Sequence, residues 1–270
     1  MIDIGSGPPL LLIPGLQGRW EWMLPAIRAL ARHFRVISFT LAGDWGSDVG
    51  FDQRLGFDNF VLQIDRVFEQ AGIERADLCG VSYGGLIALR YAALRPSRVG
   101  HLVLVSALPP DYEADDRYRF YRRAPVLLLP VFAVGAAQRV SPELRAALPR
   151  LRDRLRLLPQ AARVLAAPVS PRHMKRRMEL IGTVNFAADA RHVRAPALAI
   201  TGERGLVRTV PVDLTCRYLD CLPGAEHAVL ERTGHMGTVT RPDAFASLVA
   251  DFVARRAPGP SPASSGLTAG

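Results

Sequence analysis

The sequence predicts an α/β protein with a mostly parallel, doubly wound sheet and one inserted α-helical segment. Short continuous apolar runs alternate with helical patterns over the first hundred residues, as is typical of strands joined by crossover helices. The alternation stops between residues 111 and 194 and then resumes. With 270 residues, of which 49% are hydrophobic, the chain can bury a core large enough for such a sheet.

The elements of the first half follow from the spacing of their apolar side chains. Continuous apolar runs at residues 10–13, 35–39 and 99–105 predict strands that are covered on both faces. Residues 22–32 and 57–71 place apolar side chains at helical spacing, which predicts helices packed against the sheet. Residues 1–4 could form only a short strand.

A sharp turn joins a third apolar run to an Ala/Leu-rich helical pattern at Gly80-Val81-Ser82-Tyr83-Gly84. A strand, a tight turn with small flanking residues and a helix would expose Ser82 above the sheet, at the positive end of the helix dipole. Chemistry that passes through an oxyanion places a nucleophile at such a position. The alternative interpretation is a Gly/Ser turn with no chemical role. We favour the nucleophile because of the strand and helix on either side.

Residues 111–194, here called the insertion, predict four or so short helices rather than further strands. Prolines are expected to break the helical patterns, at Pro125, Pro130, Pro142, Pro149, Pro159, Pro168 and Pro171. We therefore expect a core domain at residues 1–110 and 195–256, and a helical cap between its two halves. Residues 257–270, rich in Pro, Ser, Gly and Ala, are expected to form a disordered tail.

The positive charge of the chain is concentrated in the insertion. The formal net charge is +9, and residues 112–194 hold 17 Lys and Arg against seven Asp and Glu. A cap that attracts anionic substrates or a membrane surface is one interpretation. We favour a solvated arginine face above an apolar underside. That underside would include Leu144, Leu148, Leu151 and Leu155.

Three motifs in residues 8–108 resemble the N-terminal half of an α/β-hydrolase. Pro14-Gly15-Leu16 stands where that family has His-Gly-x, Gly43 to Ser47 forms the turn after the next strand, and Gly80 to Gly84 forms the nucleophile turn. The resemblance implies a helical cap and an oxyanion hole made by the backbone N–H groups of Leu16 and Tyr83. Two fixed donors facing a developing alkoxide typically contribute about 3 kcal/mol each.

The last third of the chain supplies a base for this chemistry. Strands are expected at residues 197–201 and 228–231, and Gly234-His235 follows the second of them, before a final helix at residues 242–255. This pair resembles the Gly-His of the family, and the resemblance implies that His235 is the general base for Ser82. A buried structural histidine is the alternative interpretation.

The acid of a catalytic triad is missing from its usual place. In the family the loop after the penultimate strand reads Gly-x-x-Asp-x-x-x-Pro, but here the corresponding positions are Gly205, counted from Gly202, or Val207, counted from Pro211. Asp111 or Glu203 could replace the acid, or a Ser–His dyad could act alone. Loss of the acid typically lowers kcat by a factor of about 10⁴.

These parts predict a serine hydrolase that cleaves carboxylic esters or lactones of small to medium acyl compounds through an acyl-enzyme. Hydrolysis of a carbon–carbon bond in a diketone is the second interpretation, and a catalytically silent binding protein is the third. We expect a small-molecule substrate, no metal, no cofactor and no nucleic-acid partner. No apolar run is long enough for an integral membrane segment and no signal peptide is apparent, so a cytoplasmic protein is expected.

Overall fold

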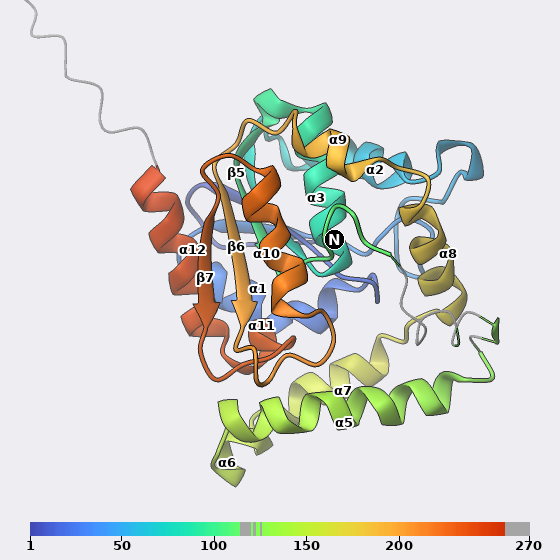
Figure 1. Ribbon diagram of the computed structural model, residues 1–270, viewed down its shortest axis with the longest axis vertical. Helices are drawn as coiled ribbons and strands as arrows, with labels where there is room; N and C mark the ends of the chain where they lie inside the picture. The colour runs from blue at the N-terminus through green and yellow to red at the C-terminus, as the bar shows by residue number, and fades with distance from the viewer. Residues whose placement is uncertain (114–119, 121–122, 125, 257–270) are drawn as a thin grey trace, which may run out of the picture.

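The computed structural model describes residues 1–113, 120, 123–124 and 126–256. Its centre is a seven-stranded sheet with the order β1-β3-β2-β4-β5-β6-β7 (Figure 1). Only β1 runs antiparallel to its neighbour, and the other pairs are parallel. The strands are β1 (Ile2–Ile4), β2 (Pro9–Ile13), β3 (Arg35–Ser38), β4 (Ala76–Val81), β5 (Val99–Val105), β6 (Ala197–Gly202) and β7 (Glu226–Leu230). The expected fold class is confirmed, with a leading strand of only three residues.

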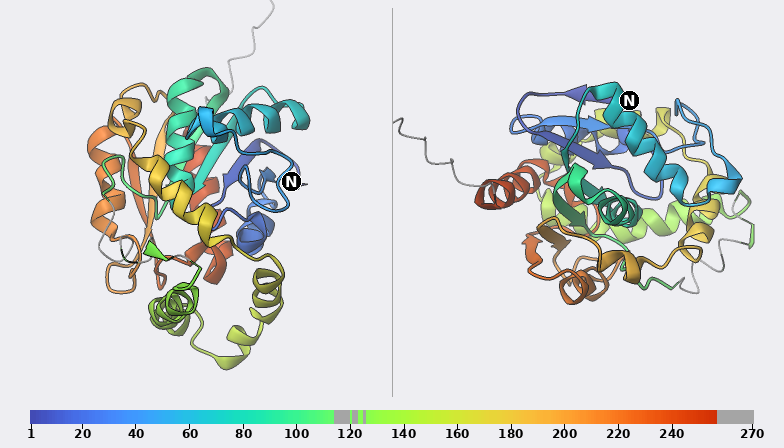
Figure 2. Two further views of the ribbon diagram at one scale, coloured as in Figure 1. Left: turned by 90° about the vertical axis from the view of Figure 1, so that its right-hand side faces the viewer. Right: turned by 90° about the horizontal axis from the view of Figure 1, so that it is seen from above.

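Helices cover both faces of the sheet, which explains why its central strands β2, β4, β5 and β6 are almost entirely buried, whereas the edge strands β1 and β7 are partly exposed (Figure 2). Leu11 and Ile13 of β2 pack into one core cluster, while Leu10 and Leu12 pack into the other. The first face is covered by α2 (Asp58–Ala71), α3 (Tyr83–Leu94), α9 (Phe186–Ala190) and α10 (Val212–Cys221). The second face is covered by α1 (Leu24–Leu30) and α12 (Pro242–Arg256). Shorter helical turns are η1 (Trp20–Met23), η2 (Gln53–Leu55), η3 (Pro96–Arg98) and α11 (Gly237–Thr240).

The insertion contributes α5 (Leu129–Ala147), α6 (Leu151–Leu155), α7 (Leu158–Ala166), α8 (Pro171–Ile181) and the short α9 described above. Helices α5, α6 and α7 lie beyond the carboxyl ends of β6 and β7, whereas α8 stands at the opposite side of the molecule from these strands (Figure 1). The segment around α7 is fastened to η1 by polar contacts. Trp22 Nε1 donates to the carbonyl of Ala167 at 3.1 Å, and Gln160 Nε2 donates to the carbonyl of Glu21 at 2.8 Å.

Three prolines of the insertion begin helices, while Pro149 and Pro168 lie between helices, as expected, and Pro125 lies outside the described residues. Pro130, Pro159 and Pro171 lie in the first turn of α5, α7 and α8, where the missing N–H has no intrahelical partner to lose. The break expected at Pro142 is wrong, since α5 continues through it for 19 residues in all. A helix can continue past a proline, at the cost of one backbone hydrogen bond and a kink.

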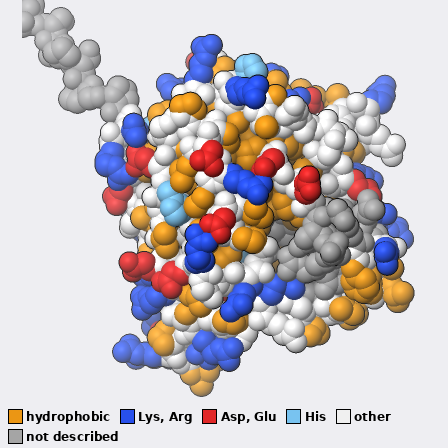
Figure 3. Space-filling model, viewed as in Figure 1, with side chains coloured by type: hydrophobic (Ala, Val, Ile, Leu, Met, Phe, Trp, Pro, Cys, Tyr) orange, Lys and Arg blue, Asp and Glu red, His pale blue; other side chains and the backbone are white. Residues whose placement is uncertain are grey.

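The outer surface of the insertion mixes arginines with exposed apolar side chains (Figure 3). The expected apolar underside is wrong for Leu151 and Leu155, which are 69% and 51% exposed. Other exposed apolar residues there are Val126, Leu127, Val131, Val134, Leu158 and Leu165. In the described part of the chain, every helix is too short or too polar to cross a bilayer. The expected disorder of residues 257–270 lies outside the described residues.

Candidate active site

Ser82 occupies a strained turn between β4 and α3. Its backbone angles are φ 54° and ψ −117°, a conformation that costs energy in any residue with a side chain. The turn also needs very close backbone approach, because a Cβ added at Gly84 would lie 2.5 Å from the carbonyl oxygen of Ile13. The structure therefore holds Ser82, which is partly exposed, at the carboxyl end of the sheet and at the N-terminus of α3.

The two predicted oxyanion donors lie on either side of this turn. Tyr83 is the first residue of α3, and its fully buried ring packs against Phe57 and Phe60, with ring centroids 5.9 and 6.0 Å apart. The loop with Leu16 follows β2 and passes close to the serine, since a Cβ added at Gly15 would lie 3.4 Å from the Cβ of Ser82. The structure thus places the loop after β2 beside Ser82.

A buried ion pair holds the peptide that follows Leu16. Arg177 of α8 is 2% exposed, donates to the carbonyl oxygen of Leu16 at 2.7 Å and pairs with Asp44 from the loop after β3. The second carboxylate oxygen of Asp44 lies 2.5 Å from Nδ1 of His173. None of these three side chains was predicted to take part in the site. In an arginine-rich segment, nothing in the sequence distinguishes Arg177 from its solvated neighbours.

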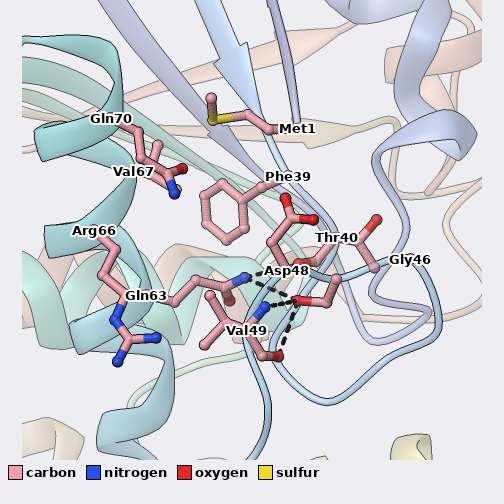
Figure 4. Close-up of a pocket in the computed structure, with 11 residues that line it drawn as sticks. Met1, Phe39, Thr40, Gly46, Asp48, Val49, Gln63, Arg66, Val67 and Gln70 are labelled. Atoms are coloured by element: carbon pink, nitrogen blue, oxygen red, sulfur yellow. Dashed lines mark hydrogen bonds between the residues drawn. The ribbon is translucent and has the colours of Figure 1, made fainter.

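The loop that carries Asp44 is itself fixed by Gln63 of α2 (Figure 4). Gln63 accepts a hydrogen bond from the backbone N–H of Ala42 at 2.9 Å and donates to the carbonyl of Thr40 at 2.8 Å. Gln63 is 2% exposed, so these bonds are shielded from water and constrain the loop strongly. The side-chain amide of Gln63 thus fixes the backbone just before Asp44.

His235 lies in the loop between β7 and α11, at the same edge of the sheet as Ser82. It lines a small cavity together with Val105 and Ser106 at the end of β5, and the carbonyl of Val105 accepts the backbone N–H of Ser82 at 2.9 Å. Burial lowers the pKa of His235 to about 4, so the ring is neutral near pH 7. Its Nδ1 atom is buried and has no hydrogen-bond partner among the described residues. No hydrogen bond between the imidazole and the Ser82 hydroxyl is present in the described part of the chain.

Neither candidate acid contacts the imidazole in the described structure. Asp111 pairs with Arg217 at 2.5 Å on the surface, where both side chains are about half exposed. Glu203 lies closer to the histidine loop, but its carboxylate accepts the backbone N–H of Arg232 at 2.7 Å. The backbone N–H of Glu203 in turn donates to the carbonyl of Thr233 at 2.8 Å. Both carboxylates therefore have other partners.

A third carboxylate, which the sequence analysis did not single out, does reach the histidine loop. Glu143 of α5 is 1% exposed and accepts the backbone N–H of Met236, at 2.9 and 3.0 Å to its two oxygens. The Thr240 hydroxyl donates to the same carboxylate at 3.3 Å. Burial raises the pKa of Glu143, and the backbone N–H groups of Gly234, His235 and Met236 together with Thr240 oppose that rise only in part.

The described residues offer no cluster of three or more His, Cys, Asp or Glu side chains suited to a metal ion. The site is instead a strained serine, a half-buried imidazole whose Nδ1 atom is shielded from water, a loop beside the serine and two buried carboxylates. Such an arrangement suits nucleophilic catalysis, because a hydroxyl and a neutral imidazole lie at the same edge of the sheet.

Comparison with known proteins extends these observations. The family model of the alpha/beta hydrolase fold matches residues 8–161. A 2-hydroxy-6-oxo-2,4-heptadienoate hydrolase from Pseudomonas putida is 26% identical over 269 residues, covering 93% of this chain and 91% of the relative. An esterase from Exiguobacterium antarcticum superposes with a TM-score of 0.78 at 18% identity, covering 94% of each chain. The enol-lactonase from Burkholderia xenovorans LB400 superposes with a TM-score of 0.72 at 20% identity, covering 94% of this chain and 95% of the other.

Proposed function

Since the chain belongs to the alpha/beta hydrolase fold family and the relatives described above are hydrolytic enzymes, we propose that it is a serine hydrolase of carboxylic esters or lactones. One observation carries the proposal: Ser82 stands in a strained turn at the N-terminus of α3, directly beside the loop with Leu16. Small to medium acyl compounds are the proposed substrates, and the insertion is the proposed cap over the site.

In the proposed reaction the Ser82 hydroxyl oxygen attacks the carbonyl carbon of the ester. His235 accepts the hydroxyl proton, and the N–H groups of Leu16 and Tyr83 bind the resulting oxyanion. Collapse of this intermediate breaks the ester bond, and the imidazolium returns its proton to the leaving alcohol. Water then attacks the acyl-enzyme with His235 again as the base, which releases the acid and restores Ser82.

The low pKa of His235 fits the first proton transfer, because the resting imidazole is neutral and ready to accept. It also sets a cost, since the imidazolium that forms is poorly solvated in a buried site. The imidazole and Ser82 are not hydrogen-bonded in the described structure. In many enzymes this bond tightens only when substrate binds.

Hydrolysis of a carbon–carbon bond is the second candidate, because the Pseudomonas putida relative is named for a 6-oxo-dienoate, which is both a ketone and a carboxylate. Such a substrate calls for a cation to receive its carboxylate. The buried guanidinium nearest the oxyanion loop, that of Arg177, is already paired with Asp44. We therefore place ester hydrolysis first.

The decisive test combines an activity probe with an assay on short-chain p-nitrophenyl esters. Wild-type protein should be labelled by a fluorophosphonate and should hydrolyse the ester, and Ser82→Ala should lose both properties. Labelling without ester turnover would exclude esters as substrates and favour the carbon–carbon candidate. If the wild type shows neither signal, the hydrolase proposal is wrong and a silent binding protein becomes the better interpretation.

A further inference from the structure

The insertion sends one buried negative charge into the core, and it does so at the loop that carries the proposed base. Glu143 lies on α5, 92 positions before His235 in the chain, and its carboxylate rests on the backbone of residues 234–236. A Cβ added at Gly234 would lie 2.8 Å from Oε2 of Glu143, so the loop has a glycine where the carboxylate approaches. The contact between Glu143 and this loop is therefore buried and closely packed, unlike a surface ion pair.

The histidine, for its part, lacks the partner that its proposed chemistry calls for. Nδ1 of His235 is buried and unpartnered among the described residues. Asp111 and Glu203 are bound to Arg217 and to the backbone of Arg232. An imidazolium formed in this place would have no adjacent anion from the core to stabilise it.

We propose that Glu143 is the positioning carboxylate of His235: it fixes the loop that bears the imidazole and supplies the negative charge that the missing triad acid would provide. The inference rests on the proposed hydrolase function. Glu143 touches neither substrate nor nucleophile in this scheme, and it acts through His235. The acid would then come from the insertion instead of from a strand end of the core.

The ionisation of Glu143 supports this view. A carboxyl group whose pKa is raised on folding contributes most to stability below its unfolded pKa, and that contribution is lost as the pH rises through the folded pKa. Above the folded pKa the ionised group therefore costs folding free energy. A structural role needs only an acceptor for the backbone N–H groups, whereas an electrostatic partner of His235 needs the charge.

The test compares Glu143→Gln with wild type in four measurements: kcat and KM on the ester, the rate of fluorophosphonate labelling, the Tm at pH 8, and the His235 pKa by NMR. We expect kcat and the labelling rate to fall by about 10- to 100-fold with KM within about twofold. The Tm at pH 8 should not fall, and the pKa of His235 should drop because a nearby anion is gone.

Glu179→Gln is the matched control, since Glu179 is also a glutamate of the insertion but its side chain is 46% exposed. It should leave all four measurements unchanged. Should Glu143→Gln fail to fold, Glu143→Asp keeps the charge on a shorter arm and should retain folding with a partial loss of kcat. Wild-type kcat in both Glu143 variants would overturn the inference.

A parallel fall of Tm and kcat in Glu143→Gln, with the His235 pKa unchanged, would also overturn it, because that pattern is a structural role alone. The NMR comparison separates the two proposals. If wild-type protein neither turns over the ester nor reacts with the fluorophosphonate, the hydrolase proposal fails, but a shifted His235 pKa would still show that Glu143 is the electrostatic partner of the imidazole.

Discussion

The imidazole of His235 makes the most direct prediction at the scale of single residues. A general base must be unprotonated, and the acid limb of kcat/KM reports its pKa in the free enzyme. Because burial lowers that pKa to about 4, kcat/KM on a short ester should stay level from pH 8 down to about pH 5 and fall below that. Circular dichroism at each pH checks that the protein is folded. A limb near the ordinary histidine value, about 6.5, would contradict the buried site.

The two carboxylates proposed from the sequence give a second prediction. Asp111 and Glu203 already have partners away from the imidazole, so Asp111→Asn and Glu203→Gln should each lower kcat by less than about tenfold, far from the factor of about 10⁴ typical of a lost triad acid. Steady-state kinetics on the ester measures this. A loss of a thousandfold or more in either variant would identify that residue as the acid.

Gly84 tests the close packing under the nucleophile. A methyl group at this position would meet the carbonyl of Ile13 at 2.5 Å, so the loop after β2 would have to shift. Gly84→Ala should lower the free energy of unfolding by about 1–3 kcal/mol and abolish fluorophosphonate labelling. Gly50→Ala is the control, since nothing lies within 4 Å of its added Cβ. Equal labelling of both variants would show that the turn tolerates the shift.

At the scale of elements, the contact between α8 and the loop after β3 depends on one buried ion pair. Asp44→Asn would leave the Arg177 guanidinium buried without its counter-charge, and breaking a buried pair in this way typically costs about 3–5 kcal/mol. Denaturant unfolding should show that loss. Asp111→Asn, which breaks the exposed pair with Arg217, should cost less than about 1 kcal/mol. Similar losses in the two variants would mean that the Asp44 pair is solvated.

The central strands were predictable because they are apolar runs with a turn signal at their ends. The expected boundaries at residues 10–13, 99–105 and 197–201 differ from β2, β5 and β6 by one residue or none. Helix α10 was not predicted. Six of its ten residues are apolar, and the buried ones, Val212, Thr215 and Tyr218, recur every three residues on one face. This spacing is a helical signal that the sequence-based prediction overlooked.

In the candidate site, too, only the features set by local sequence could be predicted. The strained turn at Ser82 could be predicted from the sequence, because the Gly-x-Ser-x-Gly pattern with its flanking strand and helix spans only a few residues. Glu143, Asp44 and Arg177 could not be found from the sequence, since their roles arise when segments more than ninety positions apart meet in the fold. Burial of a charged side chain is a tertiary property, and nothing nearby in the chain announces it.

At the scale of the whole molecule, the exposed apolar residues of the insertion are expected to promote aggregation and to contribute little to stability. Leu127 and Leu165 are 79% and 82% exposed. Replacing both with Gln should change the free energy of unfolding by less than about 0.5 kcal/mol per site and should delay the onset of aggregation on heating, as measured by light scattering. A loss of several kcal/mol would show that these side chains pack against something in solution.

The two buried carboxylates cross the same boundary in opposite directions. Asp44 belongs to the core and pairs with Arg177 of the insertion. Glu143 belongs to the insertion and accepts the backbone N–H of Met236 in the core. Moving the helices of the insertion away would therefore remove a support from the loop after β2 and from the loop that carries His235 at the same time. The insertion and the candidate site are thus held together by two reciprocal buried contacts. A variant without the insertion should therefore lose the proposed hydrolase activity altogether, rather than retain activity with lower substrate selectivity.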